Sequence, residues 1–332
     1  MKKEVDSAKM VNQEISVSAA SYPLVSIIAT CYNHEKFALD CLNAIKAQTY
    51  PNLQIIIADD CSTDRSVELI DRWILENDLK CVFIKHSVNV GLNKTLNEAL
   101  SISKGEYIAH ISTDDLWMPQ FITTYVNEIQ KRSKDYGLVY GNSFVIDELG
   151  HRMNFLRKRP DFHPEGRVLK DLVKETFLTS QAIIMKKSYL EMVGNYDERL
   201  IFEDFDIWTR LAEVCSFAYC PEILASYRVL STSLSHSRPT KMIESALIIW
   251  KRLEETHPDL RQFVEDRKVD AAKELYKLKY PNCKKYLVKL FLQRRTIRNF
   301  LFALLALIGF NYSQTNNIIE HMSSLKKAFI RQ

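Results

Sequence analysis

Short, almost wholly apolar runs alternate with longer amphipathic runs through the first third of the chain. The apolar runs, rich in β-branched residues, lie at 25–30, 53–58, 81–84 and 107–111. Between them, apolar positions recur at helical spacing over 36–47, 66–77 and 92–103. Strands that are apolar on both faces are typical of a sheet covered by helices on both sides. The alternation therefore predicts a doubly wound α/β fold with a mostly parallel sheet and right-handed crossovers.

The pattern becomes less regular after the fourth strand. It predicts a helix over 119–132, strands over 138–140, 144–146, 181–185 and 222–228, and a short helix over 188–193. The stretch 151–166 is basic and contains two prolines, so it predicts a loop. Acidic residues open the segment 202–211, whose apolar positions continue at helical spacing, so its acids belong at the N-terminus of a helix.

Beyond about residue 240, heptad-like apolar spacing predicts a series of helices. Residues 1–21 are polar and mixed in charge, and they lack the apolar centre of a secretory signal, so they predict a loosely packed tail. We therefore divide the chain into an N-terminal tail (1–22), an α/β domain (23–237) and a basic, α-helical C-terminal extension (238–332).

The C-terminal extension combines an intensely apolar run, 300–310, with flanking lysine and arginine residues. Residues 277–332 hold 11 Lys or Arg against one acid. The apolar run is shorter than the roughly 20 residues that cross a bilayer. A helix that lies in the membrane interface, with a basic collar on anionic lipid, fits this pattern. Packing in an ordinary helical core or in a dimer interface is the alternative.

Composition narrows the class of protein. A hydrophobic fraction of 46% and a charged fraction of 26% are ordinary for a folded domain. Seven cysteines without CxxC spacing favour free thiols in a reducing compartment over a disulfide framework or a zinc site. The chain has no GxGxxG and no GxxxxGKS/T sequence, which argues against a dinucleotide site and a P-loop.

Pairs of acidic residues stand where strands end or a helix begins. The pairs are Asp59-Asp60 after the second strand, Asp114-Asp115 after the fourth, and Glu203-Asp204 in the segment 202–211. Ligands of open α/β sheets bind beyond the carboxyl ends of the strands, and hard divalent cations take oxygen ligands there. Each pair alone could instead cap a helix. Together they predict a cation and ligand site at one edge of the sheet.

In chain order, residues 25–33, 57–64, 89–92, 104–108, 112–115 and 202–204 resemble the motifs of family 2 glycosyltransferases. The resemblance covers roughly two-thirds of the chain, from about residue 23 to 228. It implies the GT-A fold, which is Rossmann-like, and inverting transfer from a nucleotide-sugar donor. The chain departs from the family pattern at Thr113, which takes the first position of the usual Asp-x-Asp, and at Cys61, which replaces a glycine.

The resemblance implies nucleotide-sugar-binding roles near the strand ends. Thr30 and Tyr32 would flank the base, and Asp60 would accept a hydrogen bond from the imide N–H of uracil or thymine. Asp114 would lie near the ribose and the donor sugar. Asp115 would bind the cofactor, Mg²⁺ or Mn²⁺, against the diphosphate.

It also implies roles near the acceptor. Asp204 would be the general base that takes the proton of the acceptor hydroxyl. Glu203 would orient Asp204 or the acceptor, or cap the helix, and Trp117 would lie under a sugar ring or belong to the core. Arg228 and His236 fall where related enzymes place a loop that contacts diphosphate or metal, and for His236 a structural role stays open beside that of metal ligand.

We therefore predict an inverting, metal-dependent glycosyltransferase that moves a sugar from a UDP-sugar to a saccharide hydroxyl. A lipid-linked precursor of a surface polysaccharide, O-antigen or capsule, suits the basic, apolar extension as acceptor. Lacking a signal or a spanning segment, the enzyme is expected at the inner face of the cytoplasmic membrane, held there by its C-terminal helices. A homo-oligomer stays open, and nucleic acid is not expected as a partner.

Two other functions compete with this prediction. One is a catalytically inactive carbohydrate-binding or scaffold protein that kept the GT-A fold at the membrane surface, since fold alone does not imply activity. The other is a sugar nucleotidyltransferase, which would need a Gly-rich loop after the first strand, whereas residues 31–35 contain no glycine. The sequence leaves the sugar, the linkage and the acceptor undefined.

Overall fold

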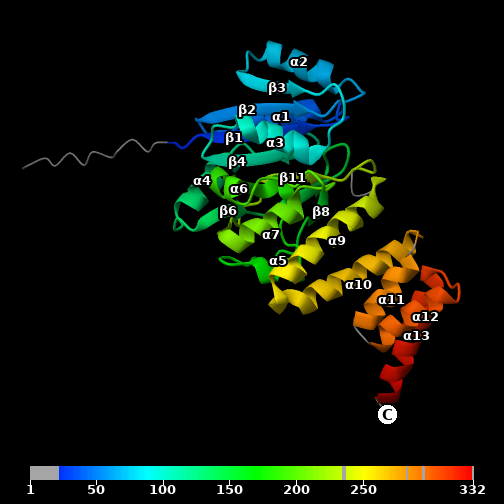
Figure 1. Ribbon diagram of the computed structural model, residues 1–332. Coiled ribbons are helices and arrows are strands. Elements are labelled where there is room, and N and C mark those ends of the chain that lie inside the picture. Colours follow the sequence, from blue (N-terminus) through cyan, green and yellow to red (C-terminus); the bar gives the residue numbers. More distant parts are fainter. Residues whose placement is uncertain (1–21, 234–236, 282, 294–295, 331–332) are drawn as a thin grey trace, which may run out of the picture.

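The computed structural model describes residues 22–233, 237–281, 283–293 and 296–330 (Figure 1). A seven-stranded sheet has the order β10-β6-β9-β4-β1-β2-β3, and a four-stranded sheet has the order β5-β11-β7-β8. The strands are β1 Val25–Cys31, β2 Leu53–Asp59, β3 Cys81–Lys85, β4 Tyr107–Ser112, β5 Leu116–Trp117, β6 Tyr136–Tyr140, β7 Ser143–Ile146, β8 Arg152–Leu156, β9 Ile183–Lys186, β10 Ser216–Tyr219 and β11 Ala225–Arg228.

Helices follow most of the strands and then take over the C-terminal part of the chain. They are α1 Ala38–Lys46, α2 Ser66–Glu76, α3 Leu92–Ile102, α4 Phe121–Gln130, α5 Leu169–Lys174, α6 Lys187–Met192, α7 Asp204–Val214, α9 Pro239–Thr256, α10 Arg261–Lys277, α11 Cys283–Gln293, α12 Ile297–Leu307 and α13 Tyr312–Ile330. Short 3-10 turns occupy Ser180–Ala182 and Pro258–Leu260.

The large sheet is mostly parallel, as the sequence predicts. Strand β1 is parallel to β2 and β4, and β2 is parallel to β3. The exception is β9, which is antiparallel to both β4 and β6. In this register Thr30 pairs with Ser112, and Cys31 pairs with Asp59. The carboxyl ends of β1, β2 and β4 therefore meet at one edge of the sheet.

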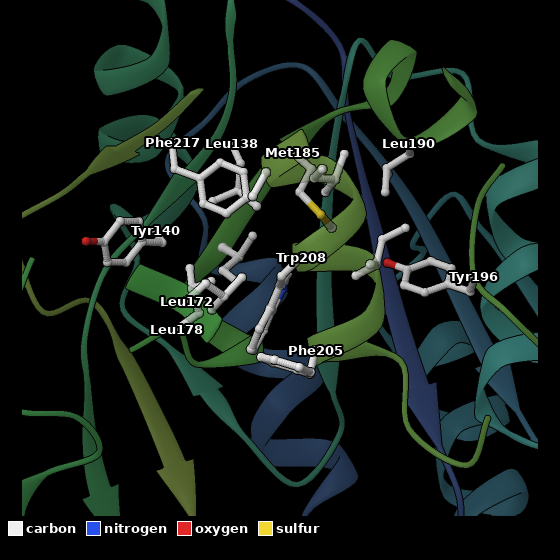
Figure 2. Packing of buried hydrophobic residues seen from close by; sticks show 14 of the residues in the cluster. Leu138, Tyr140, Leu172, Leu178, Met185, Leu190, Tyr196, Phe205, Trp208 and Phe217 are labelled. Carbon is white, nitrogen blue, oxygen red and sulfur yellow. The ribbon is translucent and has the colours of Figure 1, made fainter. Parts of the chain in front are cut away.

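Two apolar cores flank this sheet. Ile27 and Ala29 of β1 face the core formed with α1, α2 and α4. Ile28, between them, faces the core formed with α3 and α7, because successive strand residues point to opposite faces. Figure 2 shows the second core, where Phe205 and Trp208 of α7 pack among side chains from β6, β9 and α5. This packing fixes the start of α7 against the sheet.

The structure corrects one prediction about the second sheet. Residues 151–166 do not form a loop throughout, because β8 takes up Arg152–Leu156 and pairs antiparallel with β7. Its side chains are almost all exposed, Met153 and Phe155 among them, so β8 has no buried apolar face. Strands β5 and β10 and helix α5 were likewise not predicted, and each is six residues or shorter.

In the C-terminal extension, α10 to α13 form a helical unit, and α9 packs against α10 (Figure 1). The small core of this unit includes Leu275 and Tyr276 of α10, Leu287 of α11, and Phe302 and Ala306 of α12. The predicted series of helices is thus confirmed. Among the described residues, no helix combines the length and the apolar character that a membrane span requires.

Candidate active site

The ends of β1 and β4 are joined by a buried polar contact. Thr30 Oγ1 and His110 Nε2 are 2.9 Å apart, and the Thr113 N–H donates to the Thr30 carbonyl at 2.9 Å. Burial lowers the pKa of His110 to about 4, so its imidazole is neutral at pH 7. Tyr32, just beyond β1, is 43% exposed and stands open to solvent. Thr30 is therefore structurally tied to the acidic turn after β4, whereas the Tyr32 side chain is free to meet a ligand.

Asp60 is held by backbone amides at the start of α3. Its Oδ1 accepts the Val90 N–H at 2.8 Å and its Oδ2 accepts the Gly91 N–H at 2.9 Å. The Asp60 N–H donates to the Cys31 carbonyl at 2.9 Å, which ties the turn back to β1. A carboxylate oxygen can accept more than one hydrogen bond. The contacts therefore fix the Asp60 side chain and still leave it able to accept an imide N–H.

His86 connects Asp60 to a second carboxylate. Its Nδ1 lies 2.9 Å from Asp60 Oδ1, and its Nε2 lies 3.0 Å from Glu98 Oε2 on α3. Burial disfavours the charged imidazole, but the two carboxylates outweigh it and raise the pKa of His86. His86 was not singled out in the sequence, because its two partners lie on separate elements that only the fold brings together.

We expect this contact to make stability depend on pH. Since the pKa of His86 is raised on folding, its contribution is complete below the unfolded pKa of about 6.5 and is lost as pH rises through the folded pKa. His86→Gln should therefore lower the free energy of unfolding by about 1–2 kcal/mol near pH 6 and by much less near pH 9. Urea unfolding at both pH values measures this difference.

His151→Gln is the matched control for this prediction. The His151 side chain is 75% exposed and pairs with Asp147 only four residues away. An exposed pair of this kind contributes little. A His86→Gln effect that is equal at both pH values would show that the imidazolium charge does not stabilise this turn.

Asp114 and Asp115 differ in their surroundings. Asp115 is 4% exposed, and its Oδ1 accepts the Arg228 N–H at 2.8 Å. Burial and the neighbouring charge of Asp114 raise the pKa of Asp115 well above its ordinary range. Asp114 Oδ1 is buried without a hydrogen-bond partner among the described residues, and Asp114 Oδ2 is 3.9 Å from His34 Nε2. The charged form of Asp115 is thus disfavoured by its burial and by the adjacent Asp114.

Arg228 fixes this acidic turn from within. Besides its N–H bond to Asp115, its Nε donates to the Asp114 carbonyl at 2.8 Å. Its Nη1 donates to the carbonyls of Asp147 and Glu148 at 3.2 and 2.9 Å. Only 2% of Arg228 is exposed. Its guanidinium therefore positions the turn, and the expectation that it reaches the diphosphate has no support in this placement.

The chemistry of the turn suits a divalent cation. Asp114 and Asp115 offer hard oxygen ligands, one of them a buried atom without a partner. No group of three or more His, Cys, Asp or Glu side chains that could hold a metal occurs in the described part of the chain. A cation held here would need further oxygens from a ligand, and a diphosphate supplies such oxygens.

Glu203 and Asp204 stand at the start of α7, beside a small hollow of about 10 Å³ that His110 and Trp208 also line. Asp204 Oδ1 accepts the N–H of Phe205 at 2.5 Å. Burial raises the pKa of Asp204, and this hydrogen bond opposes the rise. Burial and the charge of Asp204 raise the pKa of Glu203 to about 8. Near neutral pH Glu203 is therefore protonated.

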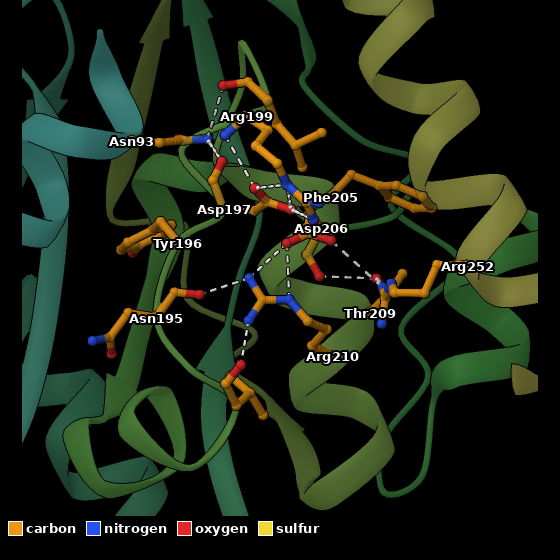
Figure 3. A network of polar contacts seen from close by, with 12 residues as sticks. Asn93, Asn195, Tyr196, Asp197, Arg199, Phe205, Asp206, Thr209, Arg210 and Arg252 are labelled. Atoms are coloured by element: carbon orange, nitrogen blue, oxygen red, sulfur yellow. Dashed lines mark hydrogen bonds and ion pairs between the residues drawn. The ribbon is translucent and has the colours of Figure 1, made fainter. Parts of the chain in front are cut away.

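A hydrogen-bond network holds the start of α7 in place (Figure 3). The amide of Asn93 on α3 donates to the carbonyls of Asp197, Leu200 and Phe202 at 2.7, 3.1 and 3.2 Å. Asp206 pairs with Arg210 at 2.5 Å. Because the amides of Val90 and Gly91 that hold Asp60 directly precede α3, the start of this helix lies between the turn that carries Asp60 and the segment that carries Asp204.

The hydroxyl of Tyr227 lies within the electrostatic reach of both acidic sites. Burial raises its pKa, the charge of Arg157 opposes the rise, and the charges of Asp115, Asp114 and Asp204 add to it. The Arg157 guanidinium carbon lies 4.5 Å from the centre of the Tyr227 ring. The acidic turn after β4 and the start of α7 therefore share one site, and Arg157 is a member that the sequence did not reveal.

Trp117 is placed in the core of the protein. Trp117 is 3% exposed, donates its Nε1–H to the Gln181 carbonyl at 2.6 Å, and stacks on Phe121 at 4.4 Å. It belongs to the core, so it does not lie under a sugar ring in this structure. His236 lies outside the described residues.

Comparison with solved structures identifies the class of protein. The chain superposes on S. aureus TarS in complex with UDP-GlcNAc with a TM-score of 0.59 at 16% identity, covering 84% of this chain and 79% of that one. The mannosyltransferase PcManGT of Pyrobaculum calidifontis, in complex with GDP-Man and Mn²⁺, gives a TM-score of 0.59 at 18% identity over 94% and 89%. The fold is that of the GT-A glycosyltransferases.

Sequence comparison then gives the family. The model of glycosyl transferase family 2 matches residues 26–194, which is half of the chain. A glycosyltransferase of Methanocaldococcus jannaschii is 31% identical over 213 residues, covering 62% of this chain and 71% of its own. The putative teichuronic acid biosynthesis glycosyltransferase TuaG of Bacillus subtilis is 24% identical over 71% of this chain and 90% of its own. The chain belongs to glycosyl transferase family 2, and it is a glycosyltransferase.

Proposed function

We propose that this glycosyltransferase moves a sugar from a UDP-sugar to a hydroxyl of a saccharide acceptor, with inversion at the anomeric carbon. The observation that carries the proposal is that Glu203 and Asp204 lie beside His110 of β4, the strand that ends at the acidic turn of Asp114 and Asp115. One carboxylate site serves the donor diphosphate and the other serves the acceptor hydroxyl. A UDP donor is supported by the TarS complexes with UDP-GlcNAc and UDP, although the mannosyltransferase neighbour binds GDP-Man.

In this mechanism Asp204 removes the proton of the acceptor hydroxyl as its oxygen attacks the anomeric carbon. The bond from that carbon to the diphosphate breaks, and the electron pair leaves on the diphosphate oxygen. A base so placed contributes about 10²- to 10⁴-fold to the rate. Asp114 and Asp115 would hold Mg²⁺ or Mn²⁺, which when bound supplies positive charge to the diphosphate. Asp60 accepts the imide N–H of the base, with Thr30 and Tyr32 beside it.

The test is a donor assay with the purified chain. UDP-, dTDP- and GDP-sugars are each incubated with Mn²⁺, with Mg²⁺ or with EDTA, and release of nucleoside diphosphate is measured. We expect release from a UDP-sugar that requires the cation. If no nucleotide-sugar is turned over and no nucleotide binds, the chain is the inactive carbohydrate-binding or scaffold protein.

We further propose that the acceptor is a lipid-linked saccharide and that the C-terminal helices rest on the inner face of the cytoplasmic membrane. Helix α12 and the residue that follows it leave a row of apolar side chains exposed, including Ile297 at 76% and Leu307 at 55% in the helix and Ile308 at 62% after it. A hollow of about 310 Å³ between α11 and α12 is lined by Lys284, Lys285, Val288, Leu292 and Leu307. Apolar side chains beside lysines complement an anionic lipid surface.

We expect vesicles that contain anionic phosphatidylglycerol to bind the chain more tightly than neutral phosphatidylcholine vesicles do. Combined Leu292→Ser and Leu307→Ser changes should weaken this binding by about tenfold or more, because both exposed side chains lose apolar area. Co-sedimentation measures the binding.

Leu75→Ser is the control, since Leu75 is 81% exposed on α2, far from these helices (Figure 1). Equal binding by all variants would contradict the membrane proposal. A dimer in gel filtration that the double variant disrupts would assign the same face to a second copy of the chain.

A further inference from the structure

The segment from β8 onward carries a cluster of cations with different surroundings. Arg152 lies 3.2 Å from the centre of an aromatic ring of β7. Arg159 pairs with a carboxylate at 3.1 Å. Lys158 Nζ donates to a backbone carbonyl at 2.8 Å. The Arg157 side chain is exposed. It makes no ion pair and no side-chain hydrogen bond with any residue that the structure describes.

The backbone around Arg157 is nevertheless firmly placed. The Arg157 N–H donates to the Ser143 carbonyl at 2.9 Å. The next residue, Lys158, is bonded to the Asn142 side chain through both its N–H, at 3.0 Å, and its carbonyl, at 2.8 Å. The guanidinium stacks over Tyr227 of β11 at 4.5 Å. The guanidinium N–H groups of Arg157 therefore remain able to donate to a ligand, and the fixed backbone holds the residue in position.

Arg157 stands between the acidic turn and the start of α7. Tyr227 precedes Arg228, and the Arg228 N–H bonds to Asp115. The Arg157 guanidinium, which stacks on Tyr227, therefore lies beside the acidic turn that carries Asp115. Its charge acts on Asp115 and also on Asp204.

We propose that Arg157 binds the diphosphate of the nucleotide-sugar donor and stabilises it as it leaves. The inference rests on the proposed function. A diphosphate brings negative charge to a turn that already holds two carboxylates, so its binding requires compensating cations. A guanidinium can give two parallel N–H bonds to phosphate oxygens. As the anomeric C–O bond breaks, negative charge grows on the diphosphate oxygen, and Arg157 stabilises that charge.

The test compares a nucleoside diphosphate with its own nucleoside. Calorimetry identifies which of UDP, dTDP and GDP the wild-type chain binds best, in the presence of Mn²⁺, and the matching nucleoside is titrated beside it. We expect Arg157→Gln to weaken diphosphate binding by about 10- to 100-fold, as loss of hydrogen bonds to a charged group does, and to leave nucleoside binding unchanged. Arg157→Lys should recover part of the loss.

Arg159→Gln is the matched control, because Arg159 lies two residues away and is already paired. It should bind the diphosphate as the wild-type chain does. If Arg157→Gln also binds it as the wild type does, the inference is wrong and the proposed function stands. If the wild-type chain binds no nucleoside diphosphate, the proposed function fails and the inference falls with it.

Discussion

Asp204→Asn should reduce turnover by about 10²- to 10⁴-fold and leave nucleotide affinity within about twofold of the wild type. Asparagine keeps the size of the side chain and can still accept the Phe205 N–H, which Asp204 Oδ1 now accepts at 2.5 Å. It cannot take a proton from the acceptor. Steady-state release of nucleoside diphosphate, together with calorimetric binding of UDP, separates the two effects.

Glu203→Gln is the control that tells the two acids apart. Because burial and the charge of Asp204 raise the pKa of Glu203 to about 8, Glu203 is protonated at neutral pH and resembles glutamine. Glu203→Gln should therefore lower turnover by about tenfold or less at pH 7. If Glu203→Gln abolishes turnover and Asp204→Asn does not, the general base is Glu203.

The carboxyl groups of Asp204 and Glu203 also predict how turnover and the stability of the fold depend on pH. Since burial raises the pKa of Asp204, turnover should increase with pH over a range above the ordinary pKa of an aspartate. A carboxyl whose pKa is raised on folding costs stability as pH rises from its unfolded value of about 4.3 through its folded value. Glu203→Gln should therefore be more stable than the wild type above about pH 8, which thermal unfolding measures.

The pattern of apolar positions predicts the alternating strands and helices of this fold. Strands β1 to β4 are apolar on both faces and helices separate them, so their alternation carries the parallel sheet and the edge at which Asp60 and Asp115 lie. Asp204 could be placed at a helix start because acids precede the apolar spacing of α7. These predictions need only local periodicity and the geometry of parallel strands.

Residues whose role depends on long-range pairing could not be predicted. Arg157 reaches the site because β8, β7 and β11 lie side by side, and β8 has no buried apolar face. Asn93 contacts carbonyls 104 to 109 residues away. For Trp117 and Arg228 the residue type suggested ligand contact, whereas burial gives both a structural role. Chemistry at a strand end can be predicted from sequence, but exposure there depends on what packs over it.

Asp115→Asn should abolish most cation-dependent turnover, by about 10²- to 10⁴-fold, while the fold becomes no less stable. Asparagine can still accept the Arg228 N–H that Asp115 Oδ1 accepts at 2.8 Å. The substitution removes the buried carboxyl group of Asp115, whose pKa is raised well above its ordinary range by burial and by Asp114. The melting temperature without metal should therefore stay equal or rise, because a like-charge contact is lost.

A residue that merely supports the turn would behave in the opposite way, since loss of its charge would leave Arg228 less well paired and lower the melting temperature. Calorimetric binding of UDP with and without Mn²⁺ completes the test, because only the wild type should gain affinity from the cation. Asp71→Asn is the control, since Asp71 is an exposed carboxylate on α2 paired with Lys85. If Asp115→Asn keeps its response to Mn²⁺ and unfolds at a lower temperature, Asp115 is a structural residue and the cation is held elsewhere.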